Sequence, residues 1–279
     1  MIYVITPVFN RVGFTRQYLE ALENQTVKDF KTIIIDDCST DGTAEMIEFN
    51  FPDVVLLKEK GDLWWAEATN IGVKFAIANG ATNIITLNDD TVPENDFIEK
   101  MMYWSSIKPN ALLGAAGVSN KTNKIIFGGK IIDWKNRSIK SLLDSLDENE
   151  LCGLHEVNFF PGRGLLIPSK IFNEIGFYDS KNFPQTIADL DFTHRAYDAG
   201  YKIFCNYDAK IMIYEDESAN SYYKNNKSIK NYIMHLFSKK GGGNIFRFIK
   251  YAYKNCPKEY LFLFILRGLF GRLLGYWQN

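Results

Sequence analysis

The sequence predicts an α/β protein whose mostly parallel sheet carries helices on both faces, followed by a basic helical tail. Over residues 1–120, short apolar runs of strand length alternate with segments of helical periodicity. This alternation favours parallel strands joined by right-handed crossovers, which bring the carboxyl ends of the strands to one edge. Residues 221–279 hold eleven Lys and Arg residues and one acidic residue, although the whole chain has a net charge of −1.

Each element of the first 120 residues has a local signal. Pro7 is expected to end the first apolar run, Asp41-Gly42 to form the turn before a short helix, and Gly80 to end a longer one. Strands are expected at residues 2–6, 32–35, 54–57 and 84–87, and helices at residues 14–24, 43–49, 66–78 and 94–107.

The pattern changes after residue 110, where glycine-rich breaks separate the apolar runs. Residues 141–152 are polar and acidic and are expected to form a loop. Gly200 follows the last periodic residues of a helix and is expected to end it. Strands are expected at residues 112–119, 124–132, 165–167, 201–205 and 211–214, and helices at residues 170–175 and 189–199.

The composition excludes several classes of protein. Of 279 residues, 46% are hydrophobic and 23% are charged, which is ordinary for a globular protein and excludes a disordered or fibrous chain. The net charge of −1 argues against a nucleic-acid partner. The cysteines at 38, 152, 205 and 256 have neither disulfide-framework nor zinc-site spacing, which favours a reducing compartment. Residues 1–5 are typical of a strand and not of a signal peptide, so we expect a cytoplasmic protein.

The basic tail has two interpretations. Its most apolar run, residues 260–266, is too short to span a bilayer. The helix either packs on protein with a solvated basic face, or lies on an anionic membrane surface and holds the protein on the inner face of the cell membrane. The glycines at 241–243 are interpreted as a flexible break and not as a phosphate loop. We therefore expect a catalytic domain over residues 1–220 and an amphipathic extension over residues 221–279.

Paired carboxylates follow two of the expected buried strands. Asp36 and Asp37 end one strand, and Asp89 and Asp90 end another, so all four are expected at the same edge of the sheet. Clustered carboxylates repel one another unless a cation joins them, and their oxygens suit Mg²⁺ or Mn²⁺. The alternative is that these acids cap the helices that follow.

Four motifs in order resemble the family 2 nucleotide-sugar glycosyltransferases over residues 1–220. These are residues 6–11 with residues 36–43, residues 61–72, Asn88-Asp89-Asp90, and Ala188-Asp189-Leu190-Asp191 before a helix. Residues 61–72 are similar to a segment of rhamnosyl- and galactofuranosyl-type members. The resemblance implies the Rossmann-like GT-A fold and an inverting transfer. It also implies a nucleotide-binding half at residues 1–120 and an acceptor-binding half at residues 121–220.

The resemblance also implies roles for donor-side residues. Pro7 and Phe9 would lie beside the base and ribose, and Asp37 would accept a hydrogen bond from the base. Asp89 would contact the ribose or the donor sugar, and Asn70 would contact the donor. Two metal ligands complete this side. Asp90 would bind Mn²⁺ or Mg²⁺, with Glu215 as a second ligand or, alternatively, a loop acid without a ligand role.

On the acceptor side, the resemblance implies that Asp189 is the general base. Asp191 would orient Asp189 or the start of the helix, with stabilisation of the helix dipole as the alternative. Arg163 would contact a phosphate or a sugar hydroxyl. Either Trp64 or Trp65 could stack on a sugar or the base, while the other packs in the core.

The leading hypothesis is therefore an inverting, metal-dependent glycosyltransferase of surface polysaccharide biosynthesis. It would move a hexosyl or deoxyhexosyl group from a UDP- or dTDP-type donor to a glycan or lipid-linked acceptor. One alternative is a nucleotidyltransferase, but residues 7–11 lack the glycines that such an enzyme needs after its first strand. Another is a silent nucleotide- or glycan-binding module, which Ala188 supports because the family usually has Glu there.

Overall fold

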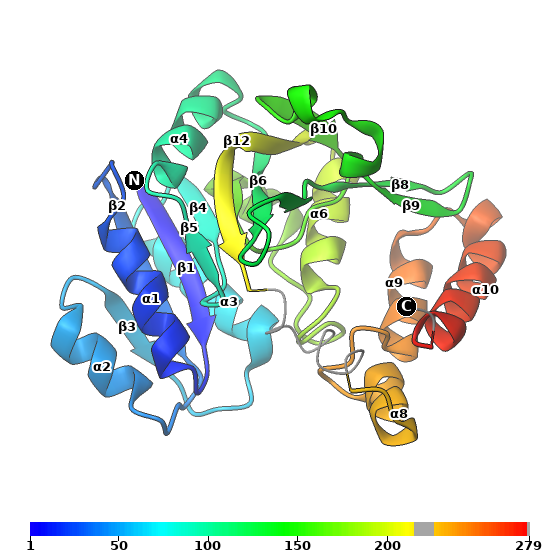
Figure 1. The fold of residues 1–279 in the computed structure, drawn as a ribbon, viewed down its shortest axis with the longest axis horizontal. Helices are drawn as coiled ribbons and strands as arrows, with labels where there is room; N and C mark the ends of the chain where they lie inside the picture. Colours follow the sequence, from blue (N-terminus) through cyan, green and yellow to red (C-terminus); the bar gives the residue numbers. More distant parts are fainter. Residues whose placement is uncertain (215–225, 278–279) are drawn as a thin grey trace.

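The computed structural model describes residues 1–214 and 226–277 and shows a central sheet flanked by helices (Figure 1). The strand order along the main path is β10-β12-β6-β11-β4-β1-β2-β3. Strands β10 (Leu154–Val157) and β11 (Leu165–Pro168) run against the other strands on this path. The predicted α/β class and mostly parallel sheet are confirmed.

The first half of the sheet is parallel throughout. Strand β1 (Ile2–Val8) pairs with β2 (Phe30–Asp36) on one side and β4 (Asn83–Thr86) on the other, and β2 pairs with β3 (Val55–Lys58). Both faces of these strands are covered, so they are continuous apolar runs rather than alternating ones. This pairing brings the residues after β2 and β4 to the same edge as the end of β1.

The second half mixes directions. Strand β6 (Leu112–Ser119) pairs antiparallel with β11 and parallel with β12 (Ile203–Ile213). The short strands β5 (Thr91–Pro93) and β7 (Ile125–Phe127) pair with β12 and β6, respectively. Strands β8 (Lys130–Asp133) and β9 (Ser138–Ser141) form a separate hairpin.

Helices cover both faces of the sheet, as predicted. Helices α1 (Val12–Glu23), α2 (Thr43–Asn50) and α4 (Phe97–Ile107) share one hydrophobic cluster with the sheet. Helices α3 (Trp64–Ala78), α5 (Ser169–Ile175) and α6 (Ala188–Asp198) share the other. Along β2, Ile33 and Ile35 enter one cluster and Ile34 enters the other, because successive strand residues point to opposite faces.

Several predicted boundaries are wrong for local reasons. Pro7 does not end β1, because pairing with β4 already stops at Ile5 and the missing N–H has no strand to face on that side. The predicted strand 124–132 divides into β7 and β8 around Gly128 and Gly129, where a Cβ atom on Gly128 would collide with the ring of Tyr207.

Two further predictions also differ from the structure. The strands predicted at 201–205 and 211–214 are the single strand β12, with a shift in pairing between Asn206 and Lys210. The predicted loop 141–152 contains two short 3₁₀ turns, Leu142–Ser145 and Glu148–Glu150.

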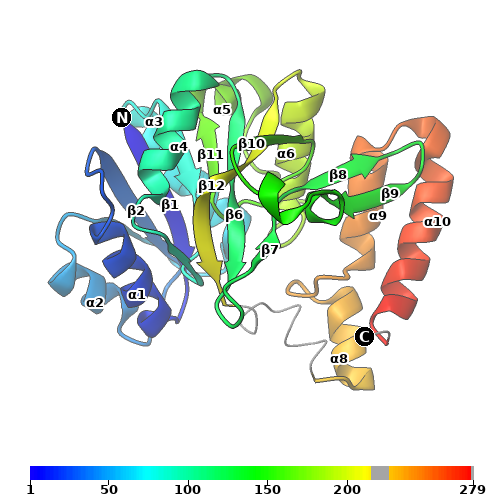
Figure 2. The ribbon, with the colours of Figure 1, turned by 45° about the horizontal axis from the view of Figure 1, so that its top comes forward.

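The described residues of the tail form helices α8 (Ile229–Phe237), α9 (Ile245–Asn255) and α10 (Lys258–Gly275), beside the β8–β9 hairpin (Figures 1 and 2). The predicted apolar stripe of α10, which includes Leu261, Phe264 and Ile265, packs with Phe248 of α9. That stripe faces protein, as the packing interpretation expected. The boundary predicted at residue 220 lies outside the described residues. In the part of the chain that is described, no helix is long and apolar enough to cross a membrane.

Candidate active site

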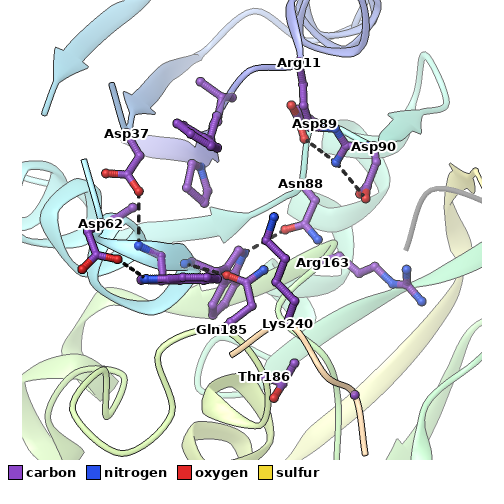
Figure 3. Close-up of a pocket in the computed structure, with 17 residues that line it drawn as sticks. Arg11, Asp37, Asp62, Asn88, Asp89, Asp90, Arg163, Gln185, Thr186 and Lys240 are labelled. Carbon is purple, nitrogen blue, oxygen red and sulfur yellow. Dashed lines mark hydrogen bonds and ion pairs between the residues drawn. The ribbon is translucent and has the colours of Figure 1, made fainter. Parts of the chain in front are cut away.

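A cavity of about 600 Å³ opens at the edge of the sheet where β1, β2 and β4 end (Figure 3). Its lining combines carboxylates, cationic side chains and two tryptophans. The predicted site residues in this lining are Pro7, Phe9, Asp37, Trp65, Asp89, Asp90 and Arg163. The structure therefore brings these predicted residues together around one cavity, although not every predicted residue reaches it.

Asp89 and Asp90 are held together by one arginine. Arg11 Nη1 lies 3.3 Å from Asp89 Oδ1 and 3.2 Å from Asp90 Oδ2, and Thr15 donates a hydrogen bond to Asp89 Oδ2 at 3.2 Å. Asp89 is only 5% exposed, and burial raises its pKa to about 6 despite the opposing effects of Arg11 and Thr15. Nothing in the sequence pattern identified Arg11 as the residue that joins this acidic pair.

Asp90 has one carboxylate oxygen that no described residue contacts through a hydrogen bond. Its Oδ1 atom is buried and has no hydrogen-bond partner among the described residues, so it fits a divalent cation that prefers oxygen ligands. The described part of the chain contains no group of three or more His, Cys, Asp or Glu side chains arranged to hold a metal. Among the described residues, Asp90 could therefore offer such a cation a single carboxylate ligand. Glu215, the second predicted ligand, lies outside the described residues.

Asp37 shapes the wall of the cavity. Its carboxylate accepts hydrogen bonds from the backbone N–H groups of Leu63, at 3.1 and 3.2 Å, and Trp64, at 3.3 Å. Asp62 and Trp64 both adopt positive φ angles of 63°, which non-glycine residues rarely do, and these bonds hold that turn in place. Asp36 is buried and instead accepts a hydrogen bond from the N–H of Ser39, so the two acids of this pair differ in role.

Both tryptophans line the cavity. Trp64 donates its indole N–H to Asp62 Oδ1 at 2.6 Å, and the ammonium of Lys239 lies 4.9 Å from its ring centroid. Trp65 donates its indole N–H to Asn88 Oδ1 at 2.9 Å and also packs against the core. Trp65 therefore both lines the cavity and packs against the core.

Asp189 lies directly behind this wall, at the start of α6. Its Oδ2 accepts a hydrogen bond from Gly162 N at 3.1 Å and its Oδ1 from Leu190 N at 2.9 Å. Burial outweighs these bonds and raises the pKa of Asp189. A Cβ atom on Gly162 would collide with the Trp65 ring and lie 3.4 Å from Asp189 Cβ, so glycine is what lets these groups meet.

Asn70 does not reach the cavity, contrary to its predicted donor contact. It is buried, its Nδ2 donates to the carbonyl of Tyr178 at 2.9 Å, and its Oδ1 accepts from Tyr178 N at 3.0 Å. Both ends of the amide are therefore used to join α3 to the segment after α5.

Asp191 does not line the cavity, but it lies in the first turn of α6, as the alternative prediction of a carboxylate at the helix dipole expected. It is fully buried and pairs with Arg195 at 2.9 Å and with Lys254 of α9 at 2.9 Å. Asn255 adds a hydrogen bond at 3.1 Å. This carboxylate therefore anchors the tail to the helix that carries Asp189.

The tail contributes to the cavity, which the sequence analysis missed. Lys240 and Gly242 line it, and the side chain of Lys240 extends into it (Figure 3). Gly241 packs against the carbonyl of His235 and Gly243 against the ring of His235, so residues 241–243 form a close-packed turn rather than a flexible break. The two lysines before these glycines were the available signal.

Arg247 fastens this turn to the cavity wall. Its Nη1 donates to Thr186 Oγ1 at 2.7 Å and to the carbonyl of Lys239 at 2.6 Å, and its side chain is nearly buried. Thr186 is itself a lining residue. These hydrogen bonds hold the 238–244 loop against the wall of the cavity.

The cavity lies beyond the carboxyl ends of β1, β2 and β4, which is where open α/β sheets bind their ligands. The chain belongs to glycosyl transferase family 2, whose profile matches residues 3–166. It is 24% identical over 231 residues to the uncharacterized glycosyltransferase RC0461 of Rickettsia conorii, an alignment covering 76% of this chain and 33% of that protein. It is 26% identical over 213 residues to RP339 of Rickettsia prowazekii, covering 73% and 58%.

The chain spans between 10% and 58% of the length of the curated relatives that it matches. Among solved structures, residues 1–349 of S. aureus TarS in complex with UDP align with a TM-score of 0.58 and 14% identity, covering 97% of this chain and 71% of that one. TarS 1–349 in complex with UDP-GlcNAc aligns with a TM-score of 0.59, covering 99% and 91%. This similarity shows that the fold is GT-A, as predicted.

Proposed function

We propose that the protein is an inverting, metal-dependent glycosyltransferase that uses a nucleoside-diphosphate sugar. The observation that carries the proposal is the single cavity in which Asp90, the two tryptophans and Lys240 converge, with Asp189 immediately behind Trp65. Such a lining offers aromatic faces for a base or sugar and cations for a diphosphate. Membership of the family supports the reaction class.

The donor would lie along the strand ends. Phe9, half exposed at the end of β1, and Asp37 would meet the base and ribose. Mn²⁺ or Mg²⁺ on Asp90 would neutralise the charge that develops on the leaving diphosphate. Asp89, whose pKa is raised to about 6, stays beside Arg11 and keeps the pair aligned.

The acceptor hydroxyl would be activated by Asp189. Each of its oxygens accepts one backbone hydrogen bond and retains a lone pair for a proton. The acceptor oxygen would attack the anomeric carbon as the bond to the diphosphate breaks, while its proton passes to Asp189. Burial raises the pKa of Asp189, which makes the carboxylate a stronger base than an exposed aspartate.

The proposed donor and acceptor classes rest on the cavity lining, on the aligned TarS structures and on the motif at residues 61–72. UDP or dTDP is the expected donor nucleotide, since the aligned TarS structures contain UDP and UDP-GlcNAc. A glycan or lipid-linked acceptor of surface polysaccharide biosynthesis is proposed, with a hexosyl or deoxyhexosyl group transferred. A rhamnosyl or galactofuranosyl donor is the subtype that residues 61–72 favour. The protein would work in the cytoplasm, peripherally on the membrane.

A screen of nucleotide sugars tests the proposal. Each donor is incubated with the protein and Mn²⁺, and both the shift in unfolding temperature and the release of free nucleotide are measured. We expect one donor to raise the unfolding temperature in a Mn²⁺-dependent way and to release nucleoside diphosphate. Binding without release, even with acceptor extracts, would instead indicate a silent binding module. Release of inorganic diphosphate from a nucleoside triphosphate and a sugar phosphate would indicate a nucleotidyltransferase.

A further inference from the structure

A second cavity of about 590 Å³ lies among the β8–β9 hairpin, α8, α9 and α10. The hairpin extends toward α10 in both views (Figures 1 and 2), and Arg267 of α10 donates to the carbonyl of Asn136 at its turn, at 3.3 Å. Gly242 lines this cavity and also the candidate active site. The 238–244 loop therefore stands between the two cavities.

The lining of this second cavity is strongly basic. It includes Arg137 and Lys140 from the hairpin and Arg267 and Arg272 from α10, and no carboxylate is present among its described lining residues. None of these four side chains forms an ion pair with a carboxylate in the part of the chain that the structure describes. Cationic groups converging on a cavity with apolar walls create a positive potential that attracts an anion.

Several donors in this cavity are buried and have no acceptor in the part of the chain that is described. Arg272 lies 3.6 Å from the ring centroid of Phe248 and donates to the carbonyl of Gly268 at 3.2 Å, but its Nε has no acceptor within the described residues. Burial lowers the pKa of Arg272 to about 10. Arg137 Nε and Ser138 Oγ are likewise buried without described partners. Buried donors of this kind are expected to have an acceptor, and a phosphate offers several oxygens at once.

The exposed side of α10 indicates where the anion comes from. Phe262, Leu266, Phe270 and Leu274 recur every four residues and are between 42% and 75% exposed, on the side away from α9. An apolar helix face next to a basic cavity matches the two parts of a lipid, whose chains are apolar and whose head group is a phosphate.

We propose that the cavity between the β8–β9 hairpin and α10 binds the phosphate of a lipid head group, while the exposed face of α10 enters the membrane surface. The inference rests on the proposed function, because a lipid phosphate held here lies across the 238–244 loop from the donor cavity. A lipid-linked acceptor would thereby be presented to the enzyme.

The test uses the full chain and vesicles of two compositions. One is pure phosphatidylcholine, and the other contains about one quarter phosphatidylglycerol. Arg137→Gln and Lys140→Gln each remove one cavity charge, and Lys135→Gln removes an exposed charge from the same hairpin outside the cavity. We expect the parent to bind only the anionic vesicles, and each cavity variant to bind them about fivefold more weakly. Lys135→Gln should bind as the parent does.

Other outcomes of these measurements would overturn the proposed lipid site. Equal losses in Lys135→Gln and Lys140→Gln would overturn the site, because they would show diffuse attraction. Binding of glycerol 3-phosphate or inorganic phosphate without vesicle binding would overturn the lipid assignment. The lipid assignment would also be overturned if the parent protein were a dimer in solution and the cavity variants were monomers. Affinity for the nucleoside diphosphate chosen by the donor screen is measured in parallel. If the parent binds it but ignores anionic vesicles, this inference fails and the proposed function stands, whereas vesicle binding without nucleotide binding contradicts the proposed function.

Discussion

Lys254 of α9 places its ammonium 2.9 Å from the carboxylate of Asp191, on the helix that carries Asp189. The carboxylate is fully buried, and Arg195 and Asn255 complete its coordination. The tail is therefore joined to α6 by an ion pair and a hydrogen bond to a buried carboxylate. These contacts link α9 to the helix that carries the candidate base.

We expect Asp191→Asn to lower the free energy of unfolding by about 3 kcal/mol, because it leaves Arg195 and Lys254 without their shared carboxylate. Urea titration measures this change. The matched control is Lys58→Met, which breaks the exposed ion pair with Glu48 and should cost less than about 1 kcal/mol. Equal losses in the two variants would show that the network contributes no more than a surface pair.

The fold could be predicted because its signals are local. Apolar runs such as Ile33–Ile35 have strand length, and alternating strands and helices admit few topologies. The parallel register then brought Asp37, Asp89 and Asp90 to one edge without further information. The predicted ends of strands were less accurate, as at Pro7. A strand can include a proline where no neighbouring strand pairs with its missing N–H, and the local sequence does not show where that pairing stops.

The site was predicted less completely because side-chain partners come from distant parts of the chain. Asn70 is 108 residues from Tyr178, whose backbone it binds, and Asp191 is 63 residues from Lys254. The residues next to each partner in the sequence do not indicate either contact. Lys240 was missed because the simplest interpretation of a basic tail is a solvent-exposed surface. Its place in the cavity accompanies the packing of the adjacent Gly241 and Gly243 on His235, which the sequence does not reveal.

Asp90→Ala should remove the Mn²⁺-dependent part of nucleoside diphosphate binding, because Asp90 Oδ1 is a buried acceptor with no partner among the described residues. Calorimetry with and without Mn²⁺ measures it. Asp37→Ala should instead weaken binding of the nucleoside and the diphosphate alike, since it loosens the turn at Leu63 and Trp64. Unchanged affinities in both variants would contradict the placement of the nucleotide.

Lys240→Ala should weaken nucleoside diphosphate binding about tenfold, because a charge-assisted contact to phosphate is lost. Binding of the corresponding nucleoside, which has no phosphate, should not change. Lys258→Ala is the control, since it removes the same charge from the tail at an exposed position outside both cavities. A loss of nucleoside affinity in Lys240→Ala would mean that the residue only supports the loop.

The raised pKa of Asp89 predicts how the free energy of unfolding changes with pH. Its pKa in the folded protein is raised to about 6, so its contribution to stability is present below about pH 4 and is lost as the pH rises through 6. The free energy of unfolding of the parent relative to Asp89→Asn should therefore fall by up to about 3 kcal/mol between pH 4 and pH 7. Denaturant titrations in a chelator measure the difference, and one that stays flat or rises with pH would contradict the raised pKa.

Single-turnover transfer by Asp189→Asn tests the central claim most directly. Asparagine keeps the shape of the side chain but cannot take the acceptor proton. We therefore expect donor affinity within about twofold of the parent and a transfer rate lower by about 10²–10⁴-fold. Asp198→Asn, at the exposed end of the same helix, should transfer at the parent rate. Transfer by Asp189→Asn at the parent rate, with inversion at the anomeric carbon retained, would show that Asp189 is not the base.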